Sequence, residues 1–257
     1  MNMTELHIAY RTIVVREIRR FARIWQQTLL PPAITIALYF VIFGTLIGPR
    51  IGDMSGFSYI EFVVPGLIMM SVITNAYGNV VSSFYGSKFQ RNIEELLVSP
   101  VPNIVILLGY VTGGVARGLS VGLIVTLLSL FFTQLQIHSL LTTVTIVFLT
   151  AILFSLAGFI NAIFAGSFDD ISIIPTFVLT PLTYLGGVFY SINMLPEFWQ
   201  GVSQLNPILY MVNAFRYGFL GVSDISLVWA FSIVIGFFFF LSIYCLYLLE
   251  KSKKLRT

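Results

Sequence analysis

The chain has 257 residues, and its composition excludes most classes of soluble protein. Hydrophobic residues make up 57% of it, charged residues only 10%, and the net charge is +3. Soluble domains have roughly 45–50% apolar residues, and this chain folded in water would leave a large apolar surface exposed. We therefore predict an all-α integral membrane protein in which residues 1–257 form one domain.

Basic residues gather at the two ends of the chain. Residues 1–25 hold five Arg and two Glu, and residues 250–257 hold four Lys or Arg and one Glu, so each end carries +3 and the part between them −3. Basic segments that flank apolar spans stay on the cytoplasmic side of a membrane. The sequence therefore predicts that both termini are cytoplasmic and that the charge serves the membrane rather than nucleic acid.

Residues 1–25 have the pattern of an amphipathic helix that precedes the first span. Two sets of side chains recur at helical spacing, an apolar set and a basic set: Tyr10, Val14, Ile18, Ala22 and Trp25, and Arg16, Arg19, Arg20 and Arg23. Such a helix lies in the membrane interface with its basic side toward anionic headgroups. A basic topology signal with no further role is an equally open interpretation.

Six apolar stretches follow, each near the ~20 residues that a hydrocarbon core of ~30 Å requires. We place them at 29–48, 58–84, 104–132, 139–165, 171–190 and 227–249, with a cytoplasmic tail at 250–257. The outer loops are then 49–57, 133–138 and 191–226, and the inner loops are 85–103 and 166–170. Four shorter spans with two interfacial helices are an alternative that the charge symmetry disfavours.

Glycines and two charged residues stand out inside the spans. Gly109 and Gly113 form a GxxxG pair, and three further glycines continue at four-residue spacing: Gly114, Gly118 and Gly122. Small residues on one face let helices approach closely in lipid, which predicts a tight packing surface. For Arg117 we favour a position near the cytoplasmic interface over a pair with a buried acid, and for Glu61 we expect contact with headgroups.

The inner loop contains a second amphipathic segment, Lys88 to Val98. Ser87 and Gln90 fit a capping box, and Pro100 forces the chain away from the helical conformation, so we expect a helix of about three turns. Phe89, Ile93, Leu96 and Leu97 would lie on one face, with Arg91, Asn92, Glu94 and Glu95 on the remainder. An apolar face of this kind favours docking, either under the spans or on another protein.

The outer segment 191–226 is only moderately apolar and is broken by Pro196 and Pro207. Trp199, Tyr210 and Tyr217 are typical of a membrane interface. Irregular backbone is tolerated at membrane depth where protein or water surrounds it. A short helical hairpin that enters the outer leaflet and returns is therefore expected, with a loose surface loop as the alternative.

The chain lacks the parts of an enzyme. No G-x-x-x-x-G-K-[ST] phosphate loop is present, so ATP and Mg²⁺ would have to be bound by another subunit. Only two histidines, His7 and His138, occur, and the predicted topology separates them, which excludes a shared metal site. The single cysteine, Cys245, cannot form an internal disulfide. We expect no catalytic, cofactor or metal residues.

A secondary transporter is the live alternative, and a membrane scaffold without transport is a third. An ion-coupled transporter needs ionisable groups at mid-depth, whereas the spans hold mainly uncharged polar residues. Those proposed to line a pathway are Asn75, Asn79, Thr180, Thr183 and Tyr184, although hydrogen bonding between helices explains such residues as well.

Four segments resemble the permease subunits of ABC-2 type exporters, and the resemblance covers nearly the whole chain. They are "EELLVSPVP" (94–102), "FDDIS" (168–172), "PTFVLTPLTYLGGVFYSINMLPEFWQ" (175–200) and "LNPILYMVNAFRYG" (205–218). The resemblance implies a bacterial inner-membrane homodimer of six-span subunits that exports a hydrophobic or amphipathic substrate. Two separate ATP-binding subunits would supply the energy.

The same resemblance assigns roles to particular residues. Residues 88–98 look like the coupling helix that contacts the ATPase, with Asp169 and Asp170 as a smaller second contact, and residues 1–25 look like the interfacial connecting helix. The outer segment looks like a re-entrant gate. Its residues would be Pro196, Phe198, Trp199, Asn206, Pro207, Tyr210 and Arg216.

Overall fold

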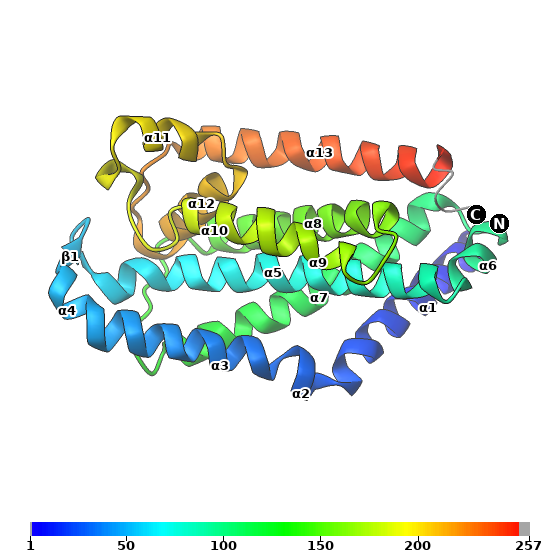
Figure 1. Ribbon diagram of the computed structural model, residues 1–257, viewed down its shortest axis with the longest axis horizontal. Helices are drawn as coiled ribbons and strands as arrows, with labels where there is room; N and C mark the ends of the chain where they lie inside the picture. Colours follow the sequence, from blue (N-terminus) through cyan, green and yellow to red (C-terminus); the bar gives the residue numbers. More distant parts are fainter. Residues whose placement is uncertain (1, 252–257) are drawn as a thin grey trace.

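A computed structural model describes residues 2–251 as a bundle of long helices with short helices at both ends (Figure 1). The only strands among these residues are the two-residue β1 and β2, so the fold is nearly all-α, as predicted. The elements in chain order are α1 (Met3–Arg23), α2 (Trp25–Thr28), α3 (Leu30–Tyr39), the π-helix η1 (Phe40–Ile47), α4 (Gly48–Ile51), β1 (Asp53–Met54), β2 (Phe57–Ser58), α5 (Tyr59–Phe89), α6 (Asn92–Val98), α7 (Asn103–Ser129), α8 (Leu140–Phe164), α9 (Asp170–Ile174), the π-helix η2 (Pro175–Leu179), α10 (Thr180–Leu185), the 3₁₀-helix η3 (Ile192–Met194), α11 (Glu197–Gln204), α12 (Pro207–Leu220) and α13 (Leu227–Lys251).

Five helical segments of residues 2–251 are long and apolar enough to cross a membrane. They cover Trp25–Ile51, Tyr59–Phe89, Asn103–Ser129, Leu140–Phe164 and Leu227–Lys251. The fifth predicted span, 171–190, corresponds to the shorter helical run Asp170–Leu185. At ~1.5 Å per residue this run is about 24 Å long, which is less than a full hydrocarbon core. Six spans therefore remain a prediction.

The long helices differ in how much of their surface is buried. In α5, 78% of the most apolar window is buried, whereas the values are 11% for Trp25–Ile51 and 22% for α13. Figure 1 shows α5 running through the middle of the bundle, with α3 and α13 on opposite outer sides. Because α3 and α13 keep apolar faces uncovered, these faces are suited to lipid or to a second subunit.

The beginning of α1 and the end of α13 lie at one end of the bundle, together with α6; we call this the α6 end (Figure 1). The opposite end, which we call the α4 end, holds α4, the β1–β2 hairpin and α11. The hairpin pairs Asp53 with Ser58 and Met54 with Phe57. Its turn needs positive φ at Ser55 and Gly56 (53° and 86°), and glycine adopts such angles without strain.

Glu61 does not extend to headgroups as expected. Its Oε2 atom accepts hydrogen bonds from the Ser58 amide (2.9 Å) and the Ser58 hydroxyl (2.6 Å), which completes a capping box at the start of α5. The first amides of a helix have no intrahelical partner, and a carboxylate three residues along satisfies them.

The glycines of α7 form two packing surfaces within one subunit, as the sequence suggested. A Cβ atom on Gly109 would lie 2.5 Å from Ile13, and one on Gly113 would lie 2.5 Å from Glu17, so this pair receives α1. Gly118 and Gly122 meet Ala76 and Val72 of α5 at 2.9 and 2.6 Å instead. The absent side chains thus let two different helices approach the α7 backbone.

The substitution Gly113→Ala is expected to destabilise the protein by about 1–3 kcal/mol, the usual cost of overpacking a close contact. The matched control is Gly78→Ala in α5, where a new Cβ meets nothing within 4 Å and the higher helix propensity of Ala raises stability slightly. Thermal unfolding in detergent measures both. Equal midpoints for the two variants would contradict the packing of α1 on Gly113.

Candidate functional site

The helix at the α6 end begins later than the sequence predicted. Ser87 is not a cap but lies inside α5, where its hydroxyl donates to the Ser83 carbonyl (3.1 Å) and accepts from Tyr110 (3.1 Å). Arg91 takes a left-handed conformation (φ 63°), and α6 then covers only Asn92–Val98. It ends at Val98 as expected, because Ser99 before Pro100 is extended. The surface helix is about 10 Å long rather than 16 Å.

Only part of the predicted apolar face of α6 faces the bundle. Ile93 is 2% exposed, and Leu96 and Leu97 are half-buried against the core. Phe89 belongs to the end of α5 instead and is 64% exposed. The helix is therefore seated on the bundle through Ile93, which leaves Glu94 and Glu95 on its exposed side.

Lys88 and Asp170 fix the connection between α8 and α9 near the end of α5. Lys88 Nζ donates to the carbonyls of Ile163 and Ala165 at 2.8 Å each, which satisfies free acceptors at the end of α8. Asp170 Oδ2 accepts from the amides of Gly166 and Ser167 at 2.8 and 3.1 Å. Lys88 and Asp170, for which the resemblance implied contact with the ATPase, thus also fix the fold, whereas Asp169 is exposed.

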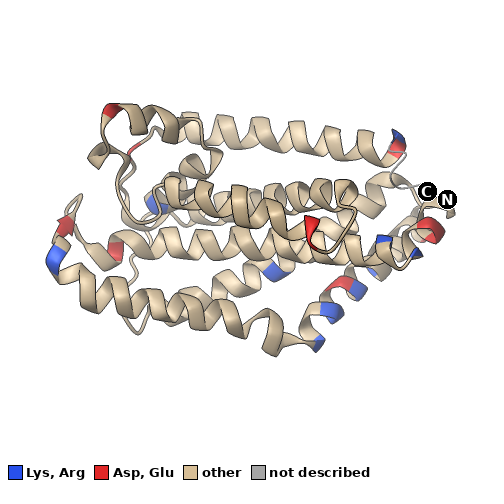
Figure 2. Cartoon of the chain, in the orientation of Figure 1, with Lys and Arg blue, Asp and Glu red and all other residues tan. Residues whose placement is uncertain are grey.

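Three aromatic rings join the two segments that the resemblance assigned to coupling. The ring of Phe168, in the α8–α9 connection, lies 5.0 Å from both the Tyr85 and the Phe89 ring centroids. Phe168 is 52% exposed. Phe89 and Phe168 are exposed, and the same segments hold the exposed acids Glu94, Glu95 and Asp169; we call these five residues the coupling surface. Figure 2 shows the acidic residues of α6 and those at the start of α9 as separate red stretches of the ribbon.

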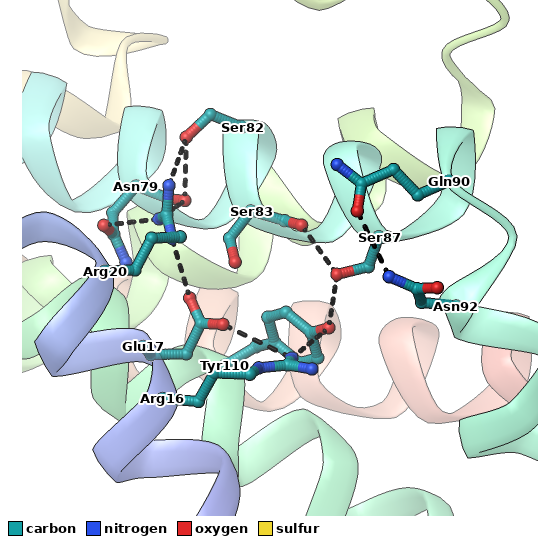
Figure 3. Close-up of polar contacts among 10 residues, drawn as sticks. All are labelled: Arg16, Glu17, Arg20, Asn79, Ser82, Ser83, Ser87, Gln90, Asn92 and Tyr110. Atoms are coloured by element: carbon teal, nitrogen blue, oxygen red, sulfur yellow. Dashed lines mark hydrogen bonds and ion pairs between the residues drawn. The ribbon is translucent and has the colours of Figure 1, made fainter.

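A polar network connects α1 to this region, and the sequence analysis missed its centre, Glu17 (Figure 3). The Glu17 carboxylate is 1% exposed and lies 3.4 Å from Arg16 Nη2 and 3.5 Å from Arg20 Nε. Arg16 Nη2 also donates to Tyr110 (2.6 Å), whose hydroxyl donates to Ser87. Arg20 Nη2 donates to the Asn79 carbonyl and side chain at 2.9 and 2.8 Å.

This network changes the expected environment of α1. Arg16 contacts Tyr110 of α7 and Arg20 contacts Asn79 of α5. Both arginines also pair with Glu17, since a buried carboxylate needs cationic partners. Ile13 and Phe21 are buried, while Ile18 and Trp25 of the predicted apolar face are 38% and 52% exposed. The one available signal was the position of Glu17, an isolated acid next to one arginine and three residues before another.

Arg117 lies well inside α7, which begins at Asn103, and its expected position near the cytoplasmic interface stays a prediction. The alternative of a pair with a buried acid is not seen, because the one buried acid within residues 2–251, Glu17, pairs with Arg16 and Arg20. The Arg117 Nη2 atom donates to Asn75 Oδ1 (3.3 Å) and the Thr28 carbonyl (3.4 Å), which are neutral oxygens. Since Thr28 is the last residue of α2, this arginine ties the end of α2 to α5.

The proposed pathway residues have mixed surroundings. Asn75 and Asn79 are buried and hydrogen-bonded to Arg117 and Arg20, so both join helices within the subunit. Thr183 is also buried and donates to the Leu179 carbonyl (2.7 Å). Thr180 and Tyr184 are exposed on the short run Asp170–Leu185. The structure does not bring these five residues together around one channel.

The outer segment 191–226 contains the short 3₁₀-helix η3 and two α-helices, α11 and α12, which are joined at Leu205 and Asn206. Asn206 caps α12 by accepting from the Ile208 amide (3.0 Å), and Pro207 takes the first helical position, where its missing N–H is harmless. Phe198 and Trp199 of α11 are 72% and 47% exposed. By contrast, α12 is buried among α5, α8 and α13. At 14 residues it is about 21 Å long, too short to cross a bilayer.

Arg216 is the largest fully buried side chain of the protein's described residues. Its Nε donates to the Phe62 carbonyl (3.2 Å), its Nη2 to the Gly187 carbonyl (2.6 Å), and its guanidinium lies 3.8 Å from the centre of the Phe62 ring. Asp224, which the sequence analysis missed, accepts from Ser191 Oγ and the Ile192 amide. Together they fix the segment after α10 to α12.

No group of three His, Cys, Asp or Glu side chains within residues 2–251 is arranged to hold a metal ion. His138 packs against Gly221 and Tyr217 near the end of α12, far along the chain from His7 on α1. The candidate site consists of the coupling surface and the buried helix α12.

Comparison with family models matches residues 8–220 to the ABC-2 type transporter family. The chain belongs to this family. Of the curated relatives, the inner membrane transport permease YadH of Escherichia coli (strain K12) is 62% identical over 250 residues, which cover 97% of this chain and 98% of the relative. Nodulation protein J of Rhizobium meliloti (strain 1021) is 25% identical over 72% of this chain and 71% of its own length.

Membership of the ABC-2 type family indicates the function of this chain in transport. The chain is a multi-pass permease of a bacterial inner membrane and a transport component of an ABC transporter. The family implies an ATP-binding partner, and no residue of the permease itself was expected to bind ATP. Both the coupling surface and α12 lie within or beside the matched residues 8–220.

Proposed function

We propose that this permease exports a hydrophobic or amphipathic substrate, driven by an ATP-binding subunit that docks on the coupling surface. The observation that carries the proposal is the contact of two exposed rings, Phe89 at the end of α5 and Phe168 in the α8–α9 connection, in segments that also present the exposed acids Glu94, Glu95 and Asp169. Because Lys88 joins α5 to α8 beneath it, a push on α6 would move two long helices together.

The proposed assembly has two copies of this chain, with both termini cytoplasmic. The uncovered apolar faces of Trp25–Ile51 and Asp170–Leu185 support a second copy, which would cover part of them. The gate at the outer side would be α11 and α12, with α12 re-entering the membrane from the α4 end. An ion-coupled mechanism is disfavoured, because Glu17, the one buried carboxylate within residues 2–251, is already paired with two arginines.

The double substitution Glu94→Lys and Glu95→Lys tests the docking of the ATPase. Charge reversal on the exposed side of α6 is expected to reduce co-purification of an ATP-binding subunit by at least tenfold and to remove stimulation of its ATPase activity, since interface charge pairs are typically worth more than 1 kcal/mol. The matched control is Asp53→Lys with Glu197→Lys, two exposed acids at the α4 end.

Both variants must insert into the membrane at wild-type levels for the comparison to count. Equal co-purification and ATPase stimulation with the α6 variant and the control would reject α6 as the docking element. Transport that persists without any ATP-binding subunit and stops when the proton or sodium gradient is collapsed would instead establish a secondary transporter.

A further inference from the structure

A groove of about 960 Å³ runs along α1 and contains all five arginines of that helix. Its lining also includes apolar side chains, so the groove is amphipathic: His7, Ile8, Arg11, Thr12, Val15, Arg16, Arg19, Arg20, Arg23 and Ile24. The sequence predicted only that the basic side of this helix faces anionic headgroups, with no defined binding site. A concave site with this lining is a different feature, because it limits the shape of what binds.

The five arginines divide into two that are held and three that are free to bind. Arg16 and Arg20 are fixed through Tyr110 and Asn79, while Glu17 balances them from the buried side (Figure 3). The side chains of Arg11, Arg19 and Arg23 are exposed, and within residues 2–251 they have no hydrogen bond or ion pair. The groove therefore has positive charge that no acid neutralises, beside two guanidinium groups that are already held in place. Guanidinium groups arranged in this way bind phosphate oxygens through charge-assisted hydrogen bonds.

The helix beside the groove leaves room for a bulky group. Arg20 Nη1 lies 3.4 Å from Ser82 of α5. One turn to either side of Ser82, on the same face of α5, are Gly78 and Gly86, where an added Cβ would meet nothing within 4 Å. The apolar part of the site continues on α1 and at the start of α2, because Ile18 of α1 and Trp25 of α2 are exposed and lie close in the sequence to Arg19 and Arg23. Trp at this position is typical of a membrane interface.

We propose that this arginine groove binds the phosphate headgroup of an anionic membrane phospholipid, with the acyl chains along the exposed apolar side of α1. A free anion would use the arginines but not Ile8, Val15 and Ile24, whereas a zwitterionic lipid would gain little from uncompensated charge. The inference does not depend on ATPase docking or on the direction of transport.

The test measures lipid binding to the full-length chain in neutral detergent by native mass spectrometry, with phosphatidylglycerol and phosphatidylcholine as probes. Wild type is expected to bind phosphatidylglycerol at least tenfold more tightly. Arg19→Gln with Arg23→Gln should weaken phosphatidylglycerol binding roughly 30-fold and leave phosphatidylcholine binding unchanged, since each arginine near an anionic surface contributes about a factor of five. These two side chains hold no other residue within 2–251, so the fold should be retained.

The matched control is Arg50→Gln, an exposed arginine at the α4 end, which should bind both lipids as wild type does. Equal loss of phosphatidylglycerol in the control and the double variant, or no preference in wild type, would overturn the proposal. Displacement of the lipid by millimolar inorganic phosphate would also overturn it, because the groove would then be a site for a free anion.

Discussion

Replacement of Arg216 by Met is expected to destabilise the folded permease by about 2–5 kcal/mol, the cost of leaving two buried carbonyls without their donor. Met fills a similar volume, so the loss would come from hydrogen bonding and not from a cavity. The carbonyls affected are those of Phe62 in α5 and Gly187 in the turn after α10. The stability of Arg216→Lys should lie between that of the Met variant and that of wild type, because a single ammonium group cannot reach both carbonyls and also stack on the Phe62 ring.

Thermal unfolding in detergent measures this effect, with Arg50→Met as the control. Arg50 is an exposed arginine at the α4 end, so its loss should change the midpoint very little. If the Arg216 and Arg50 variants unfolded at the same temperature, Arg216 would not fix α12. A destabilised Arg216 variant would in turn connect the proposed outer gate to α5, the central helix of the bundle.

Removal of the buried carboxylate in Glu17→Ala is expected to lower the free energy of unfolding by about 3 kcal/mol. This value is at the lower end of the range for breaking a buried ion pair, since Arg16 and Arg20 are partly exposed. The repulsion between these arginines would also weaken the contact of α1 with Gly113. Two readouts separate local from global effects. Trypsin cleavage at the arginines of α1 reports its release, and thiol labelling of buried Cys245 in α13 reports unfolding of the bundle.

The control for Glu17 is Glu5→Ala on the same helix, where the carboxylate is exposed and bonds only to the Asn2 amide (2.8 Å). The Glu17 variant should be cleaved much faster than this control while Cys245 stays protected. Glu17→Gln keeps the volume without the charge and should give an intermediate rate. Equal cleavage of the Ala variants would show that α1 is held by apolar packing alone.

Apolar periodicity and the positions of proline were sufficient to predict the long helices and several of their ends. The second, third, fourth and last spans lie within a few residues of their expected places, and α6 ends at Val98 because Pro100 excludes the helical conformation at Ser99. The α7 glycines were also correctly assigned to close packing. These features are local or depend on one helix face, so a single sequence contains the information.

Tertiary contacts decided the features that the sequence alone could not. Ser87 lies within α5 and accepts a hydrogen bond from Tyr110, which is 23 residues away. Lys88 caps the end of α8 by donating to the carbonyls of Ile163 and Ala165. Arg216 gives no local sign of its carbonyl partners, one of which is 154 residues distant. In a membrane a buried polar group must find its partners within the protein. The sequence by itself therefore determined which segments are helical and apolar, and the packing of the helices determined which charges are buried, paired or left to bind.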